Sequence, residues 1–375
     1  MCGIIAVLRG PEHREILTSD MILPRLTSAV TLLRSATQDP ENMYAEITQT
    51  ADLLAATDRE LRTVPGIGML VFDRSSALAI EGEILRANDA LAAIDQHLDH
   101  LAIDLEHLNS SLLEVRDSLW AIEKDRLRTA EAVLNLAGGT PELSSLPGLM
   151  SIQTALSALD RLEVRGRDSA GLEIFVTNHN LPASALEGPR FTDAILRSGA
   201  IRDCGNHIAF VYKNAAEIGD LGDNTNIIRA AILRDELLQE AIAGPESQVT
   251  VLGHTRWASV GVISEANAHP VDSQEINNND KTYVSAVLNG DIDNYMDLTE
   301  LQHLDIAPEI TTDAKVVPTL ISKELISSSN DLHAFRATVS TFEGSMAIAS
   351  HNADQPHKLS LALRGSGQAI YVGIA

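Results

Sequence analysis

Apolar residues recur at helical spacing through much of the first 150 residues of the chain. The clearest pattern is a heptad register that runs over five heptads. Its members are Leu91, Leu98, Leu105, Leu112 and Leu119 at one position and Ile94, Leu101, Leu108, Val115 and Ile122 at the other. Such a register predicts the seam of a coiled coil or of a long antiparallel helix pair. It ends at Arg126, where a further leucine is due.

A second helical stretch, residues 42–63, repeats the seven-residue spacing with Ile47, Leu54 and Leu61. It is the candidate partner for the seam. The dipeptide Pro65-Gly66 follows, and we expect residues 66–73 to be a short extended or turn segment. The spacing is compatible with pairing inside one chain and with pairing between two chains, so a homo-oligomer stays open.

The pattern changes near residue 150, after a stretch rich in Gly and Pro. Short runs with strand-like patterns then alternate with helical ones. The expected strands are 172–177, 249–252, 283–288, 345–349, 359–363 and 370–374, and the expected helices 151–162, 225–243, 313–328 and 331–342. With the apolar run 2–8 they predict an α+β or α/β enzyme-like core made of residues 1–8 and 151–375. Residues 9–150 form a helical coiled-coil insertion.

Composition excludes several classes of protein. A formal net charge of -24 over 375 residues argues against a nucleic-acid-binding surface and against docking on an anionic membrane. Only two cysteines occur, Cys2 and Cys204, which excludes a disulfide framework and fits a reducing compartment. No apolar stretch is long enough to span a bilayer, and the start lacks the features of a signal peptide. We therefore expect a cytoplasmic protein.

Cys2 becomes the N-terminal residue if Met1 is removed. It then carries a thiol and a free α-amine on one residue, so a nucleophile and a candidate base come together. The α-amine has an unperturbed pKa of roughly 7.7 to 8.0, which suits it to accepting a thiol proton. Taken alone, Cys2 is better explained as a small buried residue at the start of a strand.

Four polar segments fall at expected strand ends or in turns, where functional residues concentrate: 162–172, 254–259, 289–291 and 311–313. Taken singly, Asp313 is explained as a helix N-cap, Arg256 as a surface ion-pair former and Asn289-Gly290 as a hairpin turn. Together with Cys2 they supply the groups that hydrolysis of a small amino-acid amide requires.

Glutamine illustrates these requirements. A guanidinium such as that of Arg256 can bind its α-carboxylate in a bidentate manner. Asp313 is the candidate partner of its α-ammonium group. The oxyanion formed by thiolate attack needs preorganised donors, and the side-chain amide of Asn289 with the backbone N–H of Gly290 is a suitable pair.

The same segments carry a specific resemblance to a known family. The chain begins Cys-Gly-Ile and continues with Leu-Glu-Val-Arg-Gly-Arg-Asp-Ser-Ala-Gly at 162–171, His-Thr-Arg-Trp-Ala at 254–258, Ser-Glu-Ala-Asn-Ala-His-Pro at 264–270, Asn-Gly at 289–290 and Thr-Asp at 312–313. In this order the motifs resemble class II glutamine amidotransferase domains, in particular those of glutamine-fructose-6-phosphate amidotransferases. The resemblance covers residues 1–8 and about 151–375, apart from roughly 178–248.

The resemblance implies an N-terminal-nucleophile hydrolase fold, a four-layer αββα sandwich. It implies that Cys2 is the nucleophile and its freed amine the base, with Asn289 and Gly290 as the oxyanion hole. Arg256 and Asp313 would hold the α-groups of L-glutamine, while Trp257 and Ser259 belong to the loop over the substrate. It further implies that ammonia reaches a sugar-phosphate isomerase-type acceptor domain or subunit and converts fructose 6-phosphate to glucosamine 6-phosphate, without a metal or cofactor.

Two features depart from the family pattern. Val260 stands where the family usually has a histidine, so substrate affinity or coupling to the acceptor is expected to differ. The chain also stops at residues 371–375, where family members continue, which predicts a domain truncated at its C-terminal end: a fragment, or a chain that depends on a second polypeptide.

Two alternative functions stay open. One is the glutaminase subunit of another class II enzyme, of the amidophosphoribosyltransferase or glutamate synthase type; it is disfavoured because the arginine of those enzymes is usually followed by Tyr or Phe, and this chain has Trp257. The other is a non-catalytic scaffold that uses the coiled coil to recruit partners.

Overall fold

The computed structural model describes residues 2–38, 42–98, 106–192, 196–216, 220–275, 282–328, 330–365 and 367–373. The chain divides into two compact units. The first is built from Met1–Pro11 and Pro147–Ile374, and the second from Glu12–Leu146. The helical insertion expected from the sequence, residues 9–150, is a few residues longer at each end than this second unit.

The first unit contains a five-stranded antiparallel sheet in which the N-terminal strand pairs with a strand from much later in the chain. The strand order is β1 (Gly3–Leu8), β5 (Gln248–Arg256), β2 (Ser169–Thr177), β4 (His207–Ala215) and β3 (Ala200–Asp203). The register sets Gly3 opposite Thr255 and Leu8 opposite Thr250. Strand β2 is buried along its whole length, as expected for the central strand of a covered sheet.

A second antiparallel sheet stacks on the first. Its order is β6 (Val271–Asp272), β7 (Val284–Gly290), β8 (Met346–Asn352) and β9 (Leu359–Arg364). Leu252, Val287 and Ala349 form a small core between the sheets, against which Ile4 and Ala6 of β1 pack. The first and second sheets therefore face each other across apolar side chains, as in other sheet sandwiches.

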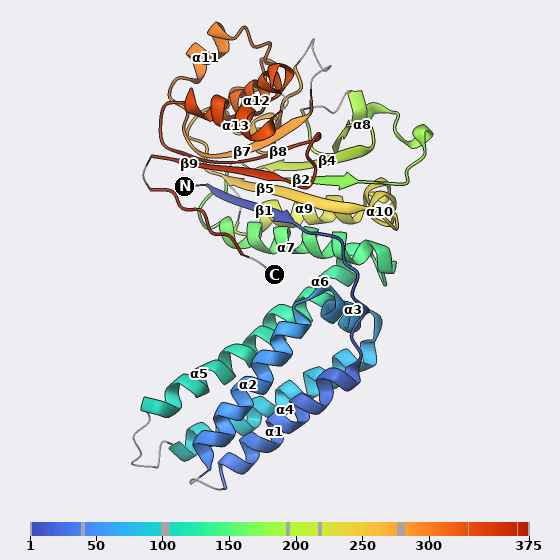
Figure 1. Ribbon diagram of the computed structural model, residues 1–375, viewed down its shortest axis with the longest axis vertical. Coiled ribbons are helices and arrows are strands. Elements are labelled where there is room, and N and C mark those ends of the chain that lie inside the picture. Colours follow the sequence, from blue (N-terminus) through green and yellow to red (C-terminus); the bar gives the residue numbers. More distant parts are fainter. Residues whose placement is uncertain are drawn as a thin grey trace. The chain divides into compact units, whose positions relative to one another are not determined.

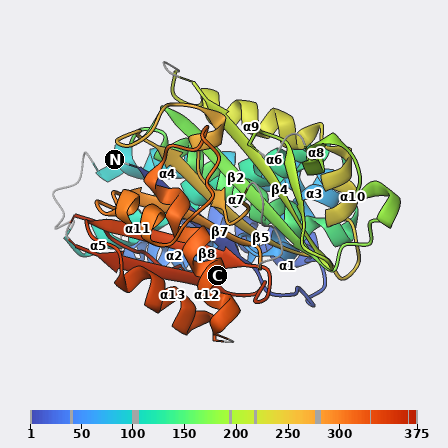
Figure 2. The ribbon, with the colours of Figure 1, turned by 90° about the horizontal axis from the view of Figure 1, so that it is seen from above.

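Helices cover the two outer faces of the sheet pair (Figures 1 and 2). The first sheet is covered by α7 (Leu146–Leu162), α9 (Asp223–Leu233) and α10 (Glu236–Ile242), and the second by α11 (Tyr295–Leu301), α12 (Val316–Ser327) and α13 (Asp331–Ser340). The short helix α8 (Pro189–Thr192) lies near β3. This arrangement confirms the expected four-layer αββα sandwich.

The second unit is helical. Its helices are α1 (Ser19–Ala36), α2 (Met43–Leu61), α3 (Val64–Phe72), α4 (Arg74–Leu98), α5 (Glu106–Trp120) and α6 (Arg128–Ala137), with a π-helix at Ala121–Leu127 between the last two. Helix α1 packs against α2 and α4, and α2 packs against α5. In the described parts of the chain, no helix combines the length and apolar character that crossing a membrane requires.

The heptad register is divided between two successive helices. Leu91, Ile94 and Leu98 are buried in α4, and Leu108, Leu112, Val115 and Leu119 are buried in α5; Leu101 and Leu105 lie outside the described residues. The residues of the register therefore lie on two helices, of which α4 packs against α1 and α5 against α2; a coiled coil stays a prediction. Both helices bury their apolar positions, which makes the seven-residue period look continuous in the sequence. The expected partner stretch is helix α2, with Ile47, Leu54 and Leu61 buried.

The heptad break at Arg126 coincides with the π-helix. Arg126 donates through Nε to Oδ1 of Asp58 at 2.8 Å, and Arg62 donates to Oδ2 of the same carboxylate at 3.0 Å. Asp58 is only 8% exposed, so its charge needs partners. The missing leucine is thus explained by an arginine that pairs with a buried carboxylate.

The expectation of an extended segment at 66–73 is wrong, because α3 occupies most of it. Thr63 caps this helix by accepting a hydrogen bond from Gly66 N at 3.2 Å, and Pro65 stands in its first turn, where no N–H is needed. Helix α3 also joins the two ends of the second unit: a Cβ added at Gly68 would lie 2.3 Å from Ile16 Cδ1 and 3.0 Å from Leu146 Cδ2. The first and last residues of the helical insertion therefore lie close together, beside α3.

Other differences concern single elements. The single helix expected at 225–243 is two helices, α9 and α10. Strands β3 and β4 were not anticipated. The strand expected at 370–374 is wrong for residues 370–373, which carry no strand pairing, while residue 374 lies outside the described residues.

Candidate functional site

Strand alternation turns three of the predicted site residues into the space between the sheets. Side chains two positions apart in a strand share a face. Ile4, Leu252 and Val287 belong to the core between the sheets. Cys2 lies on the same strand face as Ile4, Arg256 on that of Leu252, and Asn289 on that of Val287. Continuing the β1–β5 register by one residue sets Cys2 opposite Arg256.

Cys2 contacts residues from two distant segments. Its backbone nitrogen donates to Oδ1 of Asn289 at 3.3 Å, and the backbone N–H of Trp257 donates to its Sγ at 3.3 Å. Burial raises the pKa of the Cys2 thiol, and the nearby Asp291 carboxylate raises it further, while the Trp257 N–H and the Arg256 guanidinium oppose this increase. The thiol therefore needs a base to form the nucleophilic thiolate.

Asn289 and Gly290 end β7 beside Cys2. The Asn289 amide Nδ2 donates to Oε1 of Gln368 at 2.8 Å. Gly290 has φ = 109°, and a Cβ at this position would lie 2.0 Å from the backbone oxygen of Ser345. Glycine is thus required here for both its backbone conformation and its lack of a side chain.

Arg256 and Asp313, the predicted clamps, are both nearly buried, at 3% and 4% exposure. The Arg256 guanidinium donates to the backbone oxygens of Val260 and Val262. Asp313 accepts a hydrogen bond from the backbone N–H of Ile292 at 2.8 Å. Burial raises the pKa of Asp313, and the Arg256 charge acts in the opposite direction, which indicates that the two groups sense each other's charge.

The segment after β5 contains Trp257 and Ser259, predicted to belong to the loop over the substrate. The Trp257 side chain is 58% exposed. Ser259 Oγ donates to Oδ1 of Asp291 at 2.5 Å, and Ala258 N donates to Oδ2 of Asp168 at 2.7 Å. The structure thus gathers Cys2, Asn289, Gly290, Arg256, Trp257 and Ser259 around one point, with Asp313 bound to the turn that follows Gly290.

Two buried histidines, His254 and His269, pack next to each other near the site. The rings of His254 and His269 lie 4.4 Å apart between centroids, and His269 Nε2 is 3.2 Å from Thr312 Oγ1. Burial lowers the pKa of His254 to about 3 and that of His269 well below its usual value. Both side chains are therefore neutral at physiological pH.

Sequence reasoning assigned no role to three residues that the structure places at the site. Asp168 and Asp291 were visible within the polar segments, and Asp291 follows Asn289-Gly290 directly, so their positions were a usable signal. Gln368 carried none, because it stands in a stretch expected to lead into a strand.

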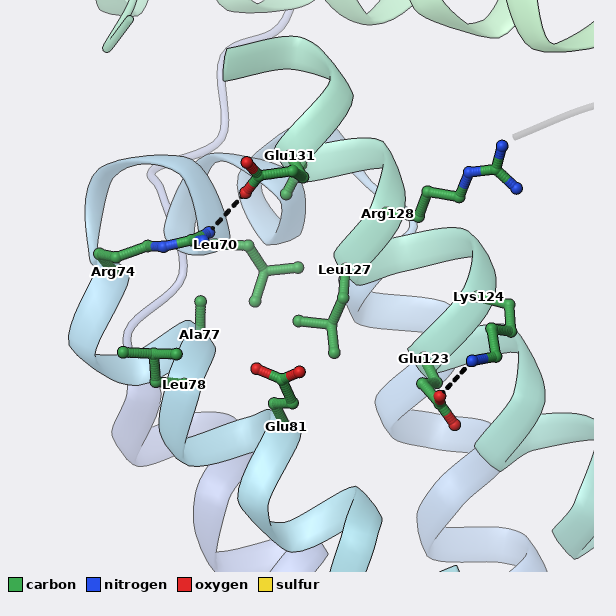
Figure 3. A pocket seen from close by; sticks show the side chains of 11 residues that line it. Leu70, Arg74, Ala77, Leu78, Glu81, Glu123, Lys124, Leu127, Arg128 and Glu131 are labelled. Atoms are coloured by element: carbon green, nitrogen blue, oxygen red, sulfur yellow. Dashed lines mark hydrogen bonds and ion pairs between the residues drawn. The ribbon is translucent and has the colours of Figure 1, made fainter. Parts of the chain in front are cut away.

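Among the described residues, no cluster of three or more His, Cys, Asp and Glu side chains is arranged to hold a metal ion. The second unit has an open pocket of about 420 Å³ between α4 and the segment 123–131 (Figure 3). Its apolar part includes Leu70, Ala77 and Leu127, and its rim contains an Arg74–Glu131 ion pair at 2.9 Å. The lining residues contain no thiol, hydroxyl or imidazole group.

Comparison with known proteins gives the following similarities. No protein-family model matches the chain. Among curated proteins, the glutamine–fructose-6-phosphate aminotransferase (isomerizing) of Leifsonia xyli subsp. xyli is 28% identical over 224 residues, which cover 60% of this chain and 28% of that protein. The proteins of the same name from Bacillus thuringiensis subsp. konkukian and Aliivibrio fischeri are each 29% identical, over 219 and 220 residues, and cover 58% of this chain and 28% of the relative.

Two solved structures also match part of the chain. One, described as the allosteric regulatory enzyme of purine biosynthesis, is 16% identical with a TM-score of 0.32 and covers 54% of this chain and 33% of that one. The other, glutamine phosphoribosylpyrophosphate amidotransferase from B. subtilis, is 14% identical with a TM-score of 0.29 and covers 52% and 37%. The matched region spans about 28% of the length of the curated relatives. Over more than half of its length, the chain is similar to class II glutamine amidotransferases of the glutamine–fructose-6-phosphate aminotransferase type.

Proposed function

We propose that this chain hydrolyses L-glutamine, with Cys2 as the nucleophile after removal of Met1. The observation that carries the proposal is the contact between Cys2 N and Asn289 Oδ1, which brings the residue with the thiol next to the residue with the amide donor. Arg256, of opposite charge to a carboxylate, and Asp313, of opposite charge to an ammonium group, are buried close by. These charges suit the two α-groups of an amino acid.

The reaction follows from these groups. The freed α-amine of Cys2 accepts the thiol proton, and Sγ attacks the side-chain carbonyl carbon of glutamine. The resulting oxyanion accepts hydrogen bonds from Asn289 Nδ2 and the Gly290 N–H. The C–N bond then breaks, the nitrogen takes up the proton and leaves as ammonia, and a γ-glutamyl thioester remains. Water hydrolyses this thioester to glutamate and restores the thiol.

The acceptor of the ammonia is inferred from the relatives. Because the matched curated proteins are named for glutamine and fructose 6-phosphate, we propose that the ammonia aminates fructose 6-phosphate to glucosamine 6-phosphate in an acceptor domain outside these 375 residues. Both cysteines are free thiols, which fits work in the cytoplasm.

The test is a glutaminase assay combined with intact-mass measurement. Chain that has lost Met1 should release glutamate and ammonia from L-glutamine, and Cys2→Ala should abolish this release. Cys204→Ala is the matched control, because burial raises the pKa of this second thiol well above its usual value, and it should keep full activity. Activity retained by Cys2→Ala, or no activity from chain with a free Cys2, would contradict the proposal.

A further inference from the structure

The side-chain amide of Asn289 is shared between the nucleophile and a residue from the end of the chain. Its Oδ1 accepts from Cys2 N at 3.3 Å, and its Nδ2 donates to Gln368 Oε1 at 2.8 Å. Gln368 is half-buried, whereas the residues that follow it are exposed, Tyr371 at 93%. Gln368 is thus turned inward from a segment that otherwise faces solvent.

The backbone directly after β9 packs beside the turn that contains Asn289 and Gly290. Gly365 has φ = 82°, and a Cβ there would lie 2.7 Å from Ser345 Oγ. The backbone oxygen of Ser345 also accepts from Asp291 N at 3.2 Å and lies against Gly290. Gly365, directly after β9, and Gly290 therefore both pack on Ser345.

Gln368 presents the same functional group as the proposed substrate. Its carboxamide oxygen accepts from the donor that the oxyanion derived from glutamine would use. We propose that Gln368 is an internal competitor of free glutamine, so that residues 367–373 restrain the site until substrate displaces the Gln368 side chain. This inference rests on the proposed glutaminase function and adds a regulatory contact to it.

The restraint is weak enough to be reversible. It consists of one hydrogen bond between neutral groups, and the exposed residues after Gln368 add little burial. A single such bond changes an equilibrium by about threefold to tenfold, and segments with few buried contacts open readily. The expected signature is therefore a change in KM for glutamine with little change in kcat, because the competitor acts before substrate is bound.

Substitutions of Gln368 in the full chain test the proposal. Gln368→Ala removes the competing oxygen and should lower KM for L-glutamine about threefold to tenfold at unchanged kcat. Gln368→Asn shortens the side chain by one methylene and should behave like the alanine variant. Gln368→Glu keeps an accepting oxygen at the same reach and should leave KM unchanged or higher. Tyr371→Ala, on the exposed part of the same segment, is the control and should change neither constant.

The outcomes separate this inference from the proposed function. Calorimetric titration of L-glutamine into chains that also carry Cys2→Ala gives affinity without turnover, and Gln368→Ala should tighten it by the same factor. If glutamine is hydrolysed and bound but Gln368→Ala leaves KM and affinity unchanged or weakens binding, the competitor is wrong while the glutaminase assignment stands. If the chain with a free Cys2 neither binds nor hydrolyses glutamine, both are overturned.

Discussion

Cys2 and Asn289 are separated by 287 positions in the chain, yet the backbone nitrogen of Cys2 donates to Oδ1 of Asn289 at 3.3 Å. Two features bring them together. Strand β1 pairs with β5, and β5 stacks on β7, whose last residues are Asn289 and Gly290. The helical insertion permits this pairing because its two ends meet at α3.

Removing the Asn289 amide should reduce catalysis more than stability. Asn289→Ala deletes one of the two proposed oxyanion donors, and the loss of one such donor typically costs about a hundredfold to a thousandfold in kcat. Steady-state glutaminase assays measure it, and circular dichroism checks that the fold is kept. A decrease of less than tenfold would place the oxyanion elsewhere.

Gly290→Ala should destabilise the first unit. The new Cβ would meet the Ser345 backbone oxygen at 2.0 Å, at a residue with φ = 109°, so we expect a loss of about 3 kcal/mol in the free energy of unfolding. Urea unfolding measures it. Gly10→Ala is the matched control, because nothing lies within 4 Å of the added Cβ, and it should be nearly neutral. Equal stability of the two variants would show that the turn relaxes freely.

Asp291 and Ser259 should affect the reaction in different ways although they share a hydrogen bond. Burial raises the pKa of Cys2, and the Asp291 carboxylate adds to this. Asp291→Asn should therefore lower that pKa and move the acidic limb of the kcat/KM profile to lower pH. Ser259→Ala loses the hydrogen bond but keeps the charge, so it should raise KM without moving the profile. Identical pH profiles for both variants and the wild type would contradict a role for the carboxylate.

Acid should destabilise the first unit through its buried histidines. Burial lowers the pKa of His254 to about 3 and that of His351 to about 4. Below pH 6.5, the usual pKa of histidine, the unfolded state binds protons that the buried rings of the folded state do not bind. The free energy of unfolding therefore decreases as pH falls from about 6.5 toward the folded pKa values. At pH 5 each ring should lower the free energy of unfolding by about 2 kcal/mol relative to pH 7. Urea midpoints at the two pH values measure this loss.

Glu173 contributes with the opposite sign. Burial raises its pKa to about 7, although Tyr283 and Ser285 donate to its two oxygens at 2.7 and 2.8 Å. Because the folded pKa of this acid lies above its unfolded pKa, its contribution to stability falls as pH rises from about 4.5 to 7. Glu173→Gln removes this contribution and should steepen the acid destabilisation. A shallower pH dependence in this variant would contradict the raised pKa of Glu173 in the folded state.

Much of the first unit could be predicted from local pattern. The runs at 172–177 and 249–252 lie inside strands, and the run at 283–288 overlaps β7 from residue 284, because β-type apolar runs bounded by turns have few alternatives. Helix α3 was missed because Pro65-Gly66 normally signals a turn, whereas here Thr63 caps the helix and places the proline in its first turn. The seven-residue spacing leaves a coiled coil and a helix pair open, because spacing does not record where one helix ends and the next begins.

The sequence by itself determined which chemical groups this protein carries: a thiol at position 2, and the amide, guanidinium and carboxylate of Asn289, Arg256 and Asp313. It also predicted that Cys2, Arg256 and Asn289 fall at strand ends and that Asp313 falls before a helix. Only the tertiary structure decided which of them meet, because that depends on sheet stacking and register rather than on spacing. The hydrogen bonds between Gln368 and Asn289 and between Ser259 and Asp291 were decided by the tertiary structure alone. Each joins residues from separate segments, and the local sequence of one segment does not predict its contact with the other.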